Sequence, residues 1–150
     1  MFTNFEIMKQ VSRVQFFYEG VRPRITGVGR LKSDIEKLFR REGRALERIV
    51  YIFCSDQQLL SINQQYLNHQ AYTDIITFDL SESEATVGEV YISWERVREN
   101  ALAFKEPISR ELRRVIFHGA LHLCGYKDKK PSEERKMREM EQFYLSRFGY

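Results

Sequence analysis

The sequence predicts an α+β fold with a single mixed β-sheet, helices packed against it and one buried central helix. Strand-like and helix-like apolar patterns follow one another in the order βαβαββααα. Two strand-like segments, 73–80 and 87–93, are too close together for a crossover helix, so they should form a hairpin or a neighbouring pair. The segment "VIFHGALHLC" (115–124) is apolar all round a helix, which is typical of the centre of a domain.

The first part of the chain predicts a strand, a helix and a second strand. "VQFFYEG" (14–20) is rich in aromatic residues and ends in glycine, which indicates a strand. Apolar residues keep helical spacing from 31 to 46. "RIVYIFCS" (48–55) is a continuous apolar run and predicts a central strand. The predicted helix would carry a basic stripe of Lys37, Arg40, Arg44 and Arg48.

The remaining elements are marked by capping and stop signals. Ser55 followed by Gln58 is a capping-box signature that opens a helix over 56–67. The β-branched segment 73–80 and the segment 87–93 are the paired strands introduced above, joined by an acidic turn.

Three helices should complete the chain. Ser93 can cap a helix that Pro107 ends. The buried helix should start at Ser109 and stop at Gly125, and Pro131 should begin the last helix.

Length and composition indicate one globular domain over residues 1–150. The hydrophobic share of 43% and the charged share of 30% are ordinary for such a domain. No apolar run is long enough for a membrane span, and the N-terminus lacks the apolar core of a signal peptide. The two cysteines, Cys54 and Cys124, form no disulfide framework, which predicts a reducing, cytoplasmic setting.

His118 and His122 interrupt the apolar segment four residues apart, so they lie on one helical face with Cβ atoms about 5–6 Å apart. Neutral imidazoles at this spacing often bind zinc together, at about 2.0–2.1 Å. A catalytic zinc usually takes three protein ligands and leaves a position for water. Asp128 is the candidate third ligand, because the chain can turn back at Gly125 and no other carboxylate occurs before Glu133.

A purely structural interpretation fits the same residues. Both histidines could be core side chains bonded to backbone carbonyls, with Asp128 in solvent. The pair alone leaves both interpretations open. The third histidine, His69, lies in a polar stretch and is expected in a surface loop.

Three segments carry a resemblance to a known family. "HGALHLCGYKD" (118–128) resembles the signature H-G-x-L-H-L-x-G-Y-D-H of the YbeY family of bacterial rRNA maturation factors. "INQQYLNHQAYTDIITF" (62–78) is similar to the family's L-N-x-x-Y-R … T-D-V-L-S-F block, and "VGEVYIS" (87–93) to its G-D-I-x-I-S strand. The segments occur in order and at the right separations, which implies a zinc-dependent endoribonuclease.

In that family three histidines of the signature hold one zinc ion. The resemblance places the first two on His118 and His122. The third position falls on Asp128, and Lys127 stands at the family's aspartate position. An aspartate oxygen is an acceptable zinc ligand at about 2.0–2.2 Å. We therefore expect one Zn²⁺ per chain, held by His118, His122 and Asp128.

A second departure is Leu67, which stands where the family has an arginine associated with RNA cleavage. An arginine would stabilise negative charge developing on phosphate oxygens, and leucine cannot. Arg113, Arg114 or Lys127 could compensate. Gly119 stands where H-E-x-x-H zinc proteases carry their glutamate base, so peptide hydrolysis by that mechanism is disfavoured.

The charge layout adds a set of candidate RNA-binding residues. Residues 1–50, 51–100 and 101–150 carry net charges of +5, −6 and +4, which together give +3. Such a chain can present a cationic surface to nucleic acid, although solvated helix faces would explain the same layout. The candidates flank Asp128 or lie near the start of the buried helix. They are Arg113, Arg114, Lys127, Lys129 and Lys130.

Two hypotheses of function follow. The first is a cytoplasmic metal-dependent endoribonuclease that cleaves single-stranded ribosomal RNA during maturation or quality control of the small ribosomal subunit, away from any membrane. The metal ion would activate water or polarise a phosphate oxygen. The alternative is a non-catalytic ribosome-assembly factor whose metal only joins the buried helix to the turn over 125–130, and Leu67 favours it. The catalytic base, the RNA bond that is cut and the oligomeric state stay open.

Overall fold

The computed structural model describes residues 12–68 and 73–150. Their elements follow the predicted order and confirm the α+β class: β1 (Val14–Tyr18), α2 (Val28–Arg41), β2 (Leu46–Cys54), α3 (Asp56–Leu67), β3 (Ile75–Asp79), β4 (Thr86–Ser93), α4 (Trp94–Ala103), α5 (Ile108–Leu123) and α6 (Pro131–Arg147). His69 lies outside the described residues. No helix in the described ranges is both long and apolar enough to cross a membrane.

The sheet is mixed, with strand order β1-β2-β4-β3. Strands β1 and β2 are parallel, as are β2 and β4, whereas β3 runs antiparallel to β4. The segments 73–80 and 87–93 are therefore neighbours, as their short separation predicts. Strand β3 is an edge strand, and the residues that line the cavity described below include several of its side chains.

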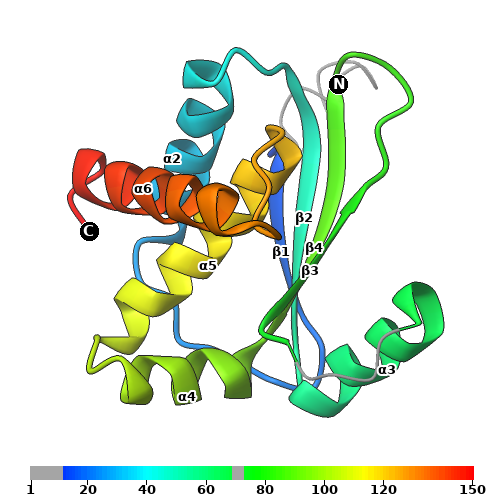
Figure 1. The fold of residues 1–150 in the computed structure, drawn as a ribbon, viewed down its shortest axis with the longest axis vertical. Helices are drawn as coiled ribbons and strands as arrows, with labels where there is room; N and C mark the ends of the chain where they lie inside the picture. Colours follow the sequence, from blue (N-terminus) through cyan, green and yellow to red (C-terminus); the bar gives the residue numbers. More distant parts are fainter. Residues whose placement is uncertain (1–11, 69–72) are drawn as a thin grey trace, which may run out of the picture.

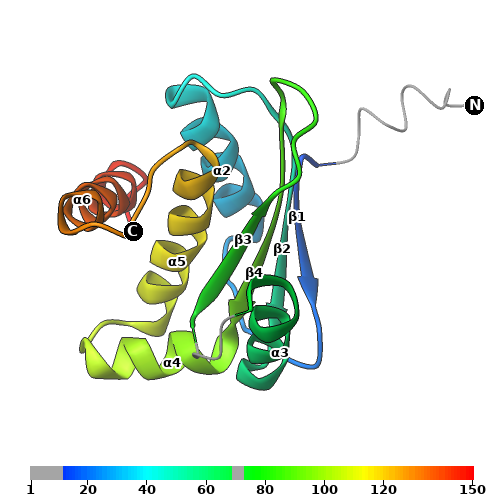
Figure 2. The same cartoon turned by 45° about the vertical axis from the view of Figure 1, so that its right-hand side comes forward.

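Helices α2, α5 and α6 form two layers on one side of the sheet. Helices α2 and α5 pack against this face, and Figure 2 shows α6 beyond α5, away from the sheet (Figures 1 and 2). Helix α3 packs against β3 and β4 on the opposite side. Because α5 is covered by the sheet and by other helices, it buries ten of its residues, as its all-round apolar pattern predicts.

Gly119 allows α5 to lie close to the sheet. A Cβ atom at this position would be 2.8 Å from Cγ1 of Val90 and 3.1 Å from Cδ1 of Ile75. These contacts are shorter than carbon atoms tolerate without a shift. The glycine that argues against a protease mechanism thus has a packing role, and it lies one residue after His118.

The end predicted for the first helix is wrong. The helix predicted over 31–46 ends at Arg41, because Gly43 adopts a left-handed conformation with φ 71° and turns the chain. Leu46 begins β2 instead, and its helical spacing from Leu38 and Phe39 is a coincidence of the sequence. Of the predicted basic stripe, only Lys37 and Arg40 are on α2; Arg44 lies in the turn and Arg48 on β2.

The other capping signals agree with the structure except at the start of α5. Ser55 and Gln58 form the predicted capping box, and Ser93 caps α4 through its side chain. Gly125, with φ 101°, follows the end of α5, and Pro131 begins α6. Helix α5 begins at Ile108 with Pro107 at the N-cap, so Ser109 lies inside its first turn and caps nothing.

Candidate metal centre

The last two turns of α5 and the following loop bring three potential metal ligands together. The ring centroids of His118 and His122 are 4.6 Å apart, with their planes at 81°. Oδ2 of Asp128 lies 3.3 Å from Nε2 of His118 and 3.2 Å from Nε2 of His122. Among the described residues, these three side chains form the one group of histidine, cysteine and acidic ligand atoms able to hold a metal ion together.

Hydrogen bonds hold the loop after α5 in place on both sides of its turn. Gly125 reverses the chain, and the backbone N–H of Tyr126 donates to the carbonyl of Leu121 at 3.0 Å. The Tyr126 hydroxyl donates to Glu42 at 2.6 Å, and the Arg44 guanidinium donates to the carbonyl of Cys124 at 3.0 Å. Asp128 therefore returns over the histidines because the α2–β2 turn holds the loop.

The hydrogen-bond partners of the two imidazoles orient them toward a common point. Nδ1 of His122 is 2.9 Å from the carbonyl oxygen of Tyr126, which can only accept, so Nδ1 carries the proton. Nδ1 of His118 is 3.3 Å from Oε2 of Glu141. Such partners usually set the tautomer of metal-binding histidines, leaving the Nε2 lone pair for the ion.

The spacing of the donor atoms suits a zinc ion. Ligands at about 2.0–2.1 Å in tetrahedral directions are separated from one another by about 3.3 Å. The two contacts from the imidazoles to Asp128, at 3.2 and 3.3 Å, agree with this separation. The three converging atoms are all acceptors. They can bind one cation together, whereas they cannot form hydrogen bonds with one another.

Glu141 connects the metal centre to a buried ionic network. The residue is 1% exposed, and its carboxylate accepts from Nη1 of Arg114 at 2.8 Å. Burial acts to raise the pKa of Glu141, but the hydrogen bond with His118 and the charge of Arg114 outweigh it and hold that pKa below its ordinary value. Glu141 is therefore an anion at neutral pH and keeps the proton on Nδ1 of His118.

Arg114 is surrounded by carboxylates. Its Nη2 lies 2.6 Å from Glu111 and 3.6 Å from Asp74, in addition to the bond with Glu141. Burial acts to lower the pKa of Arg114, but the hydrogen bonds and charges of Glu111 and Glu141 raise it above the ordinary arginine value. The positive charge of Arg114 is thus balanced by these buried or half-buried carboxylates.

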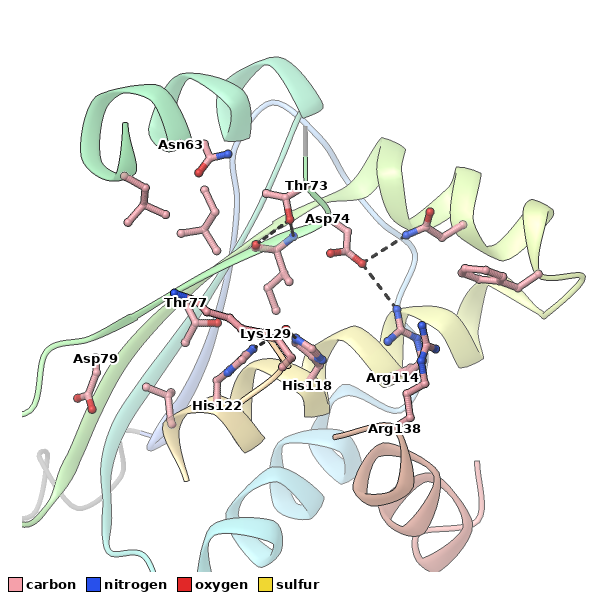
Figure 3. A pocket seen from close by; sticks show the side chains of 17 residues that line it. Asn63, Thr73, Asp74, Thr77, Asp79, Arg114, His118, His122, Lys129 and Arg138 are labelled. Carbon is pink, nitrogen blue, oxygen red and sulfur yellow. Dashed lines mark hydrogen bonds and ion pairs between the residues drawn. The ribbon is translucent and has the colours of Figure 1, made fainter. Parts of the chain in front are cut away.

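The metal centre opens into a cavity of about 840 Å³. In Figure 3 the two histidines point from α5 toward the space that Lys129 and Thr77 also border. The Thr77 hydroxyl oxygen is buried and has no hydrogen-bond partner among the described residues. The cavity is lined by Asn63, Leu67, Thr73, Asp74, Ile75, Ile76, Thr77, Asp79, Asn100, Phe104, Arg114, His118, His122, Leu123, Asp128, Lys129 and Arg138.

The predicted RNA-binding residues are distributed unevenly around this cavity. Arg114 and Lys129 line it, and Lys127 and Lys130 are exposed on the adjoining loop without lining it. Arg113 is 8% exposed and points elsewhere, because successive helical residues differ by about 100°. Its guanidinium donates to the carbonyl of Thr26 and lies 4.6 Å from the ring centroid of Tyr150.

Two residues of α6 that belong to the site did not emerge from the sequence. Arg138 lines the cavity, and Glu141 contacts His118. Glu141 falls at helical spacing between Met137 and Tyr144, on the stripe that packs into the core. A carboxylate on such a stripe is the signal that could have identified it, because a buried charge needs a partner.

Comparisons with known proteins identify a family that this chain resembles over most of its length. The family described as "Endoribonuclease YbeY" matches residues 28–149. A relative named "Endoribonuclease YbeY" from Flavobacterium psychrophilum is 50% identical over 114 residues, covering 76% of this chain and 81% of its own. One of the same name from Porphyromonas gingivalis is 44% identical over 137 residues, covering 88% and 87%.

A solved structure is similar as well. The solution structure of TM1509 from Thermotoga maritima has a TM-score of 0.61 at 28% identity, covering 90% of this chain and 88% of its own. The chain belongs to the endoribonuclease YbeY family.

Proposed function

We propose that the protein is a zinc-dependent endoribonuclease that cleaves single-stranded ribosomal RNA in the cytoplasm, during maturation or quality control of the small ribosomal subunit. The observation that carries this proposal is the convergence of His118, His122 and Asp128 at the wall of a large open cavity. Membership of the YbeY family supports the reaction class.

The protein side chains prepare the site for an ion and for a phosphodiester. A bound zinc ion would supply Lewis-acid chemistry, by polarising a phosphate oxygen or activating a water molecule. Glu141 and the Tyr126 carbonyl keep the Nδ1 protons on the two imidazoles, so that both Nε2 atoms remain donors. Asp128 adds one negative charge to the donor set, which leaves one unit of positive charge on a dication to attract phosphate.

Leu67 stands where an arginine is expected, so the positive charges at the cavity must come from other residues. Leu67 lines the cavity and is 42% exposed, yet it carries no charge. Arg114 is occupied by its three carboxylates. Lys129 borders the metal centre, and no ion pair joins it to a described residue. We assign Lys129 to the phosphate nearest the metal, with Lys127 and Lys130 extending the basic loop.

Cleavage of a model RNA tests the proposal. Zinc-loaded protein should cleave a single-stranded segment of small-subunit ribosomal RNA, chelation should abolish the cleavage, and added zinc should restore it. A duplex of the same sequence is the matched control and should stay intact. RNA binding without cleavage by fully zinc-loaded protein would contradict the proposal and support the ribosome-assembly factor.

A further inference from the structure

An exposed aromatic ring borders the cavity at the end of α4. Phe104 is 57% exposed and lines the cavity of the metal centre. It also lines an adjoining cavity of about 120 Å³, together with Arg110 and Arg138. Among the described residues no other ring contacts Phe104, so it serves neither the core nor an aromatic cluster.

The backbone holds Phe104 in place. Its N–H donates to the carbonyl of Asn100, and the next two residues bond back to Leu102 and Ala101. Lys105 adopts a left-handed conformation with φ 55°, which turns the chain toward α5. The phenyl ring is therefore presented from an ordered helix end, which reduces the entropy lost when it binds a ligand.

Arg138 is the available guanidinium of the same region. Arg114 is paired with carboxylates, and Arg110 donates to Gln142 at 3.1 Å. Arg138 is exposed and makes no hydrogen bond or ion pair with a described residue. Figure 3 shows it on α6 beside Arg114.

Helix geometry places Arg138 close to the metal centre. It lies three residues before Glu141, so the two Cβ atoms are about 5–6 Å apart on one face of α6. Glu141 in turn contacts His118. A phosphate held by Arg138 would thus be a near neighbour of one at the metal centre.

We propose that Phe104 and Arg138 form a nucleotide-binding subsite of the RNA strand, with a base stacked on Phe104 and the adjoining phosphate bound by Arg138. The proposal rests on the proposed function, because it takes single-stranded RNA as the ligand. Aromatic rings stack on any base, and guanidinium groups bind phosphate in a bidentate manner. The subsite thus selects unpaired nucleotides, since a paired base is unavailable for stacking.

The base contact can be tested with full-length, zinc-loaded protein and 2′-O-methyl oligonucleotides, whose integrity is checked on a gel. One oligonucleotide carries bases, and the other is an abasic chain of the same length. The wild-type protein should bind the first about tenfold more tightly. Phe104→Ala should lose most of that preference, and Phe104→Trp should keep it. Leu102→Ala is the control, because Leu102 is 83% exposed on the same helix and borders a different cavity.

The phosphate contact has its own readout. Arg138→Gln should weaken binding of both oligonucleotides equally and reduce the slope of log affinity against log salt by about one. Arg147→Gln removes the same charge nine residues further along α6, on its opposite side, and should leave affinity and slope nearly unchanged.

The outcomes separate the subsite from the enzyme activity. If Phe104→Ala keeps the preference for bases, or Arg138→Gln keeps the salt slope, the subsite is disproved even where the protein cleaves RNA. If both variants behave as expected and no RNA is cleaved, the subsite stands and the endoribonuclease proposal fails. No binding of either oligonucleotide by the wild-type protein would also overturn the subsite.

Discussion

At the scale of single residues, the donor set of the proposed metal centre depends on Asp128. A carboxylate replaces the third imidazole that the family signature implies, and its Oδ2 lies within 3.3 Å of both histidines. Zinc accepts aspartate and histidine at similar distances, so the replacement changes the charge of the site more than its size. The consequences can be measured at this one position.

Three substitutions of Asp128 test whether it is a ligand. Asp128→His should still bind zinc, because it restores a three-histidine set. Asp128→Ala leaves two ligands and should bind zinc more than about 100-fold more weakly. This loss exceeds the one caused by removing a residue that only hydrogen-bonds to a ligand. Asp128→Asn should fall near alanine, because a neutral amide is a poor zinc ligand. Zinc titration against a competing chelator gives the order.

A role of Asp128 in the turn alone predicts the opposite order. A residue that only bonds backbone amides would tolerate asparagine best and histidine worst. An affinity series with asparagine first would therefore remove Asp128 from the ligand set.

Substitution of Glu141 tests whether its contact with His118 strengthens zinc binding. Glu141→Gln keeps the size of the side chain but removes the charge that holds the Nδ1 proton of His118 and pairs with Arg114. We expect zinc affinity to fall about 10–100-fold and the free energy of unfolding to fall by about 1–3 kcal/mol. Glu139→Gln is the control, since Glu139 is exposed and its one ion pair within the described ranges is with Lys136. Equal zinc affinities in the two variants would show that Glu141 does not support the site.

At the scale of elements, the close approach of α5 to the sheet positions both histidines. Gly119 follows His118 on the side of α5 that faces Val90 and Ile75. A methyl group there must push the helix away from the sheet or displace those side chains. Both histidines are on the same helix, so a shift of the helix would move them together and keep their spacing.

Substitution of two helical glycines separates packing from helix propensity. Gly119→Ala should lower the free energy of unfolding by about 1–3 kcal/mol, because overpacking exceeds the gain in propensity. Gly29→Ala on α2 meets nothing within 4 Å and should raise it by up to about 1 kcal/mol. Urea unfolding measures both. A stabilised Gly119→Ala variant would mean that the helix–sheet contact adjusts without cost.

Element types were predictable from the sequence, whereas contacts between distant elements were not. The capping box at Ser55 and the stop at Gly125 act locally, so the sequence pattern reveals them. The turn at Gly43 overrides an apolar spacing that continues by chance to Leu46. The contact of Glu141 with His118 depends on how α6 packs on α5, and no local pattern contains that information.

The same limit separates Arg113 from Arg114. The sequence presents two adjacent cations at the start of the buried helix. Only the tertiary structure directs Arg114 into the cavity and Arg113 toward Thr26 and Tyr150. Asp128 could be anticipated because the chain reversal at Gly125 is local to the ligands.

At the scale of the whole molecule, the proposed metal centre joins parts of the chain that are distant in sequence. The ligands come from α5 and the loop after it, whereas Glu42 and Arg44 hold that loop and Glu141 of α6 holds His118. A ligand that binds only the folded state stabilises all of these contacts together. Metal removal should therefore lower the stability of the whole domain.

The size of this stabilisation follows from the linkage between zinc binding and folding. At a free zinc concentration 100 times the dissociation constant, the added stability is about 2.7 kcal/mol. For a chain of this length that raises the Tm by about 5–10 °C. Chelation should remove the increment, and His118→Ala should show none, because two remaining ligands make a poor zinc site. Differential scanning calorimetry with and without zinc measures it.

The packing variant provides the matched control for this measurement. Gly119→Ala lowers the stability of the metal-free protein without removing a ligand, so its Tm should still rise with zinc by nearly the wild-type amount. The Tm of His118→Ala should not rise with zinc, in contrast to that of Gly119→Ala, whatever the Tm of either metal-free variant. If zinc raises the Tm of His118→Ala as much as that of the wild-type protein, the ion binds elsewhere and the assignment of this centre is wrong.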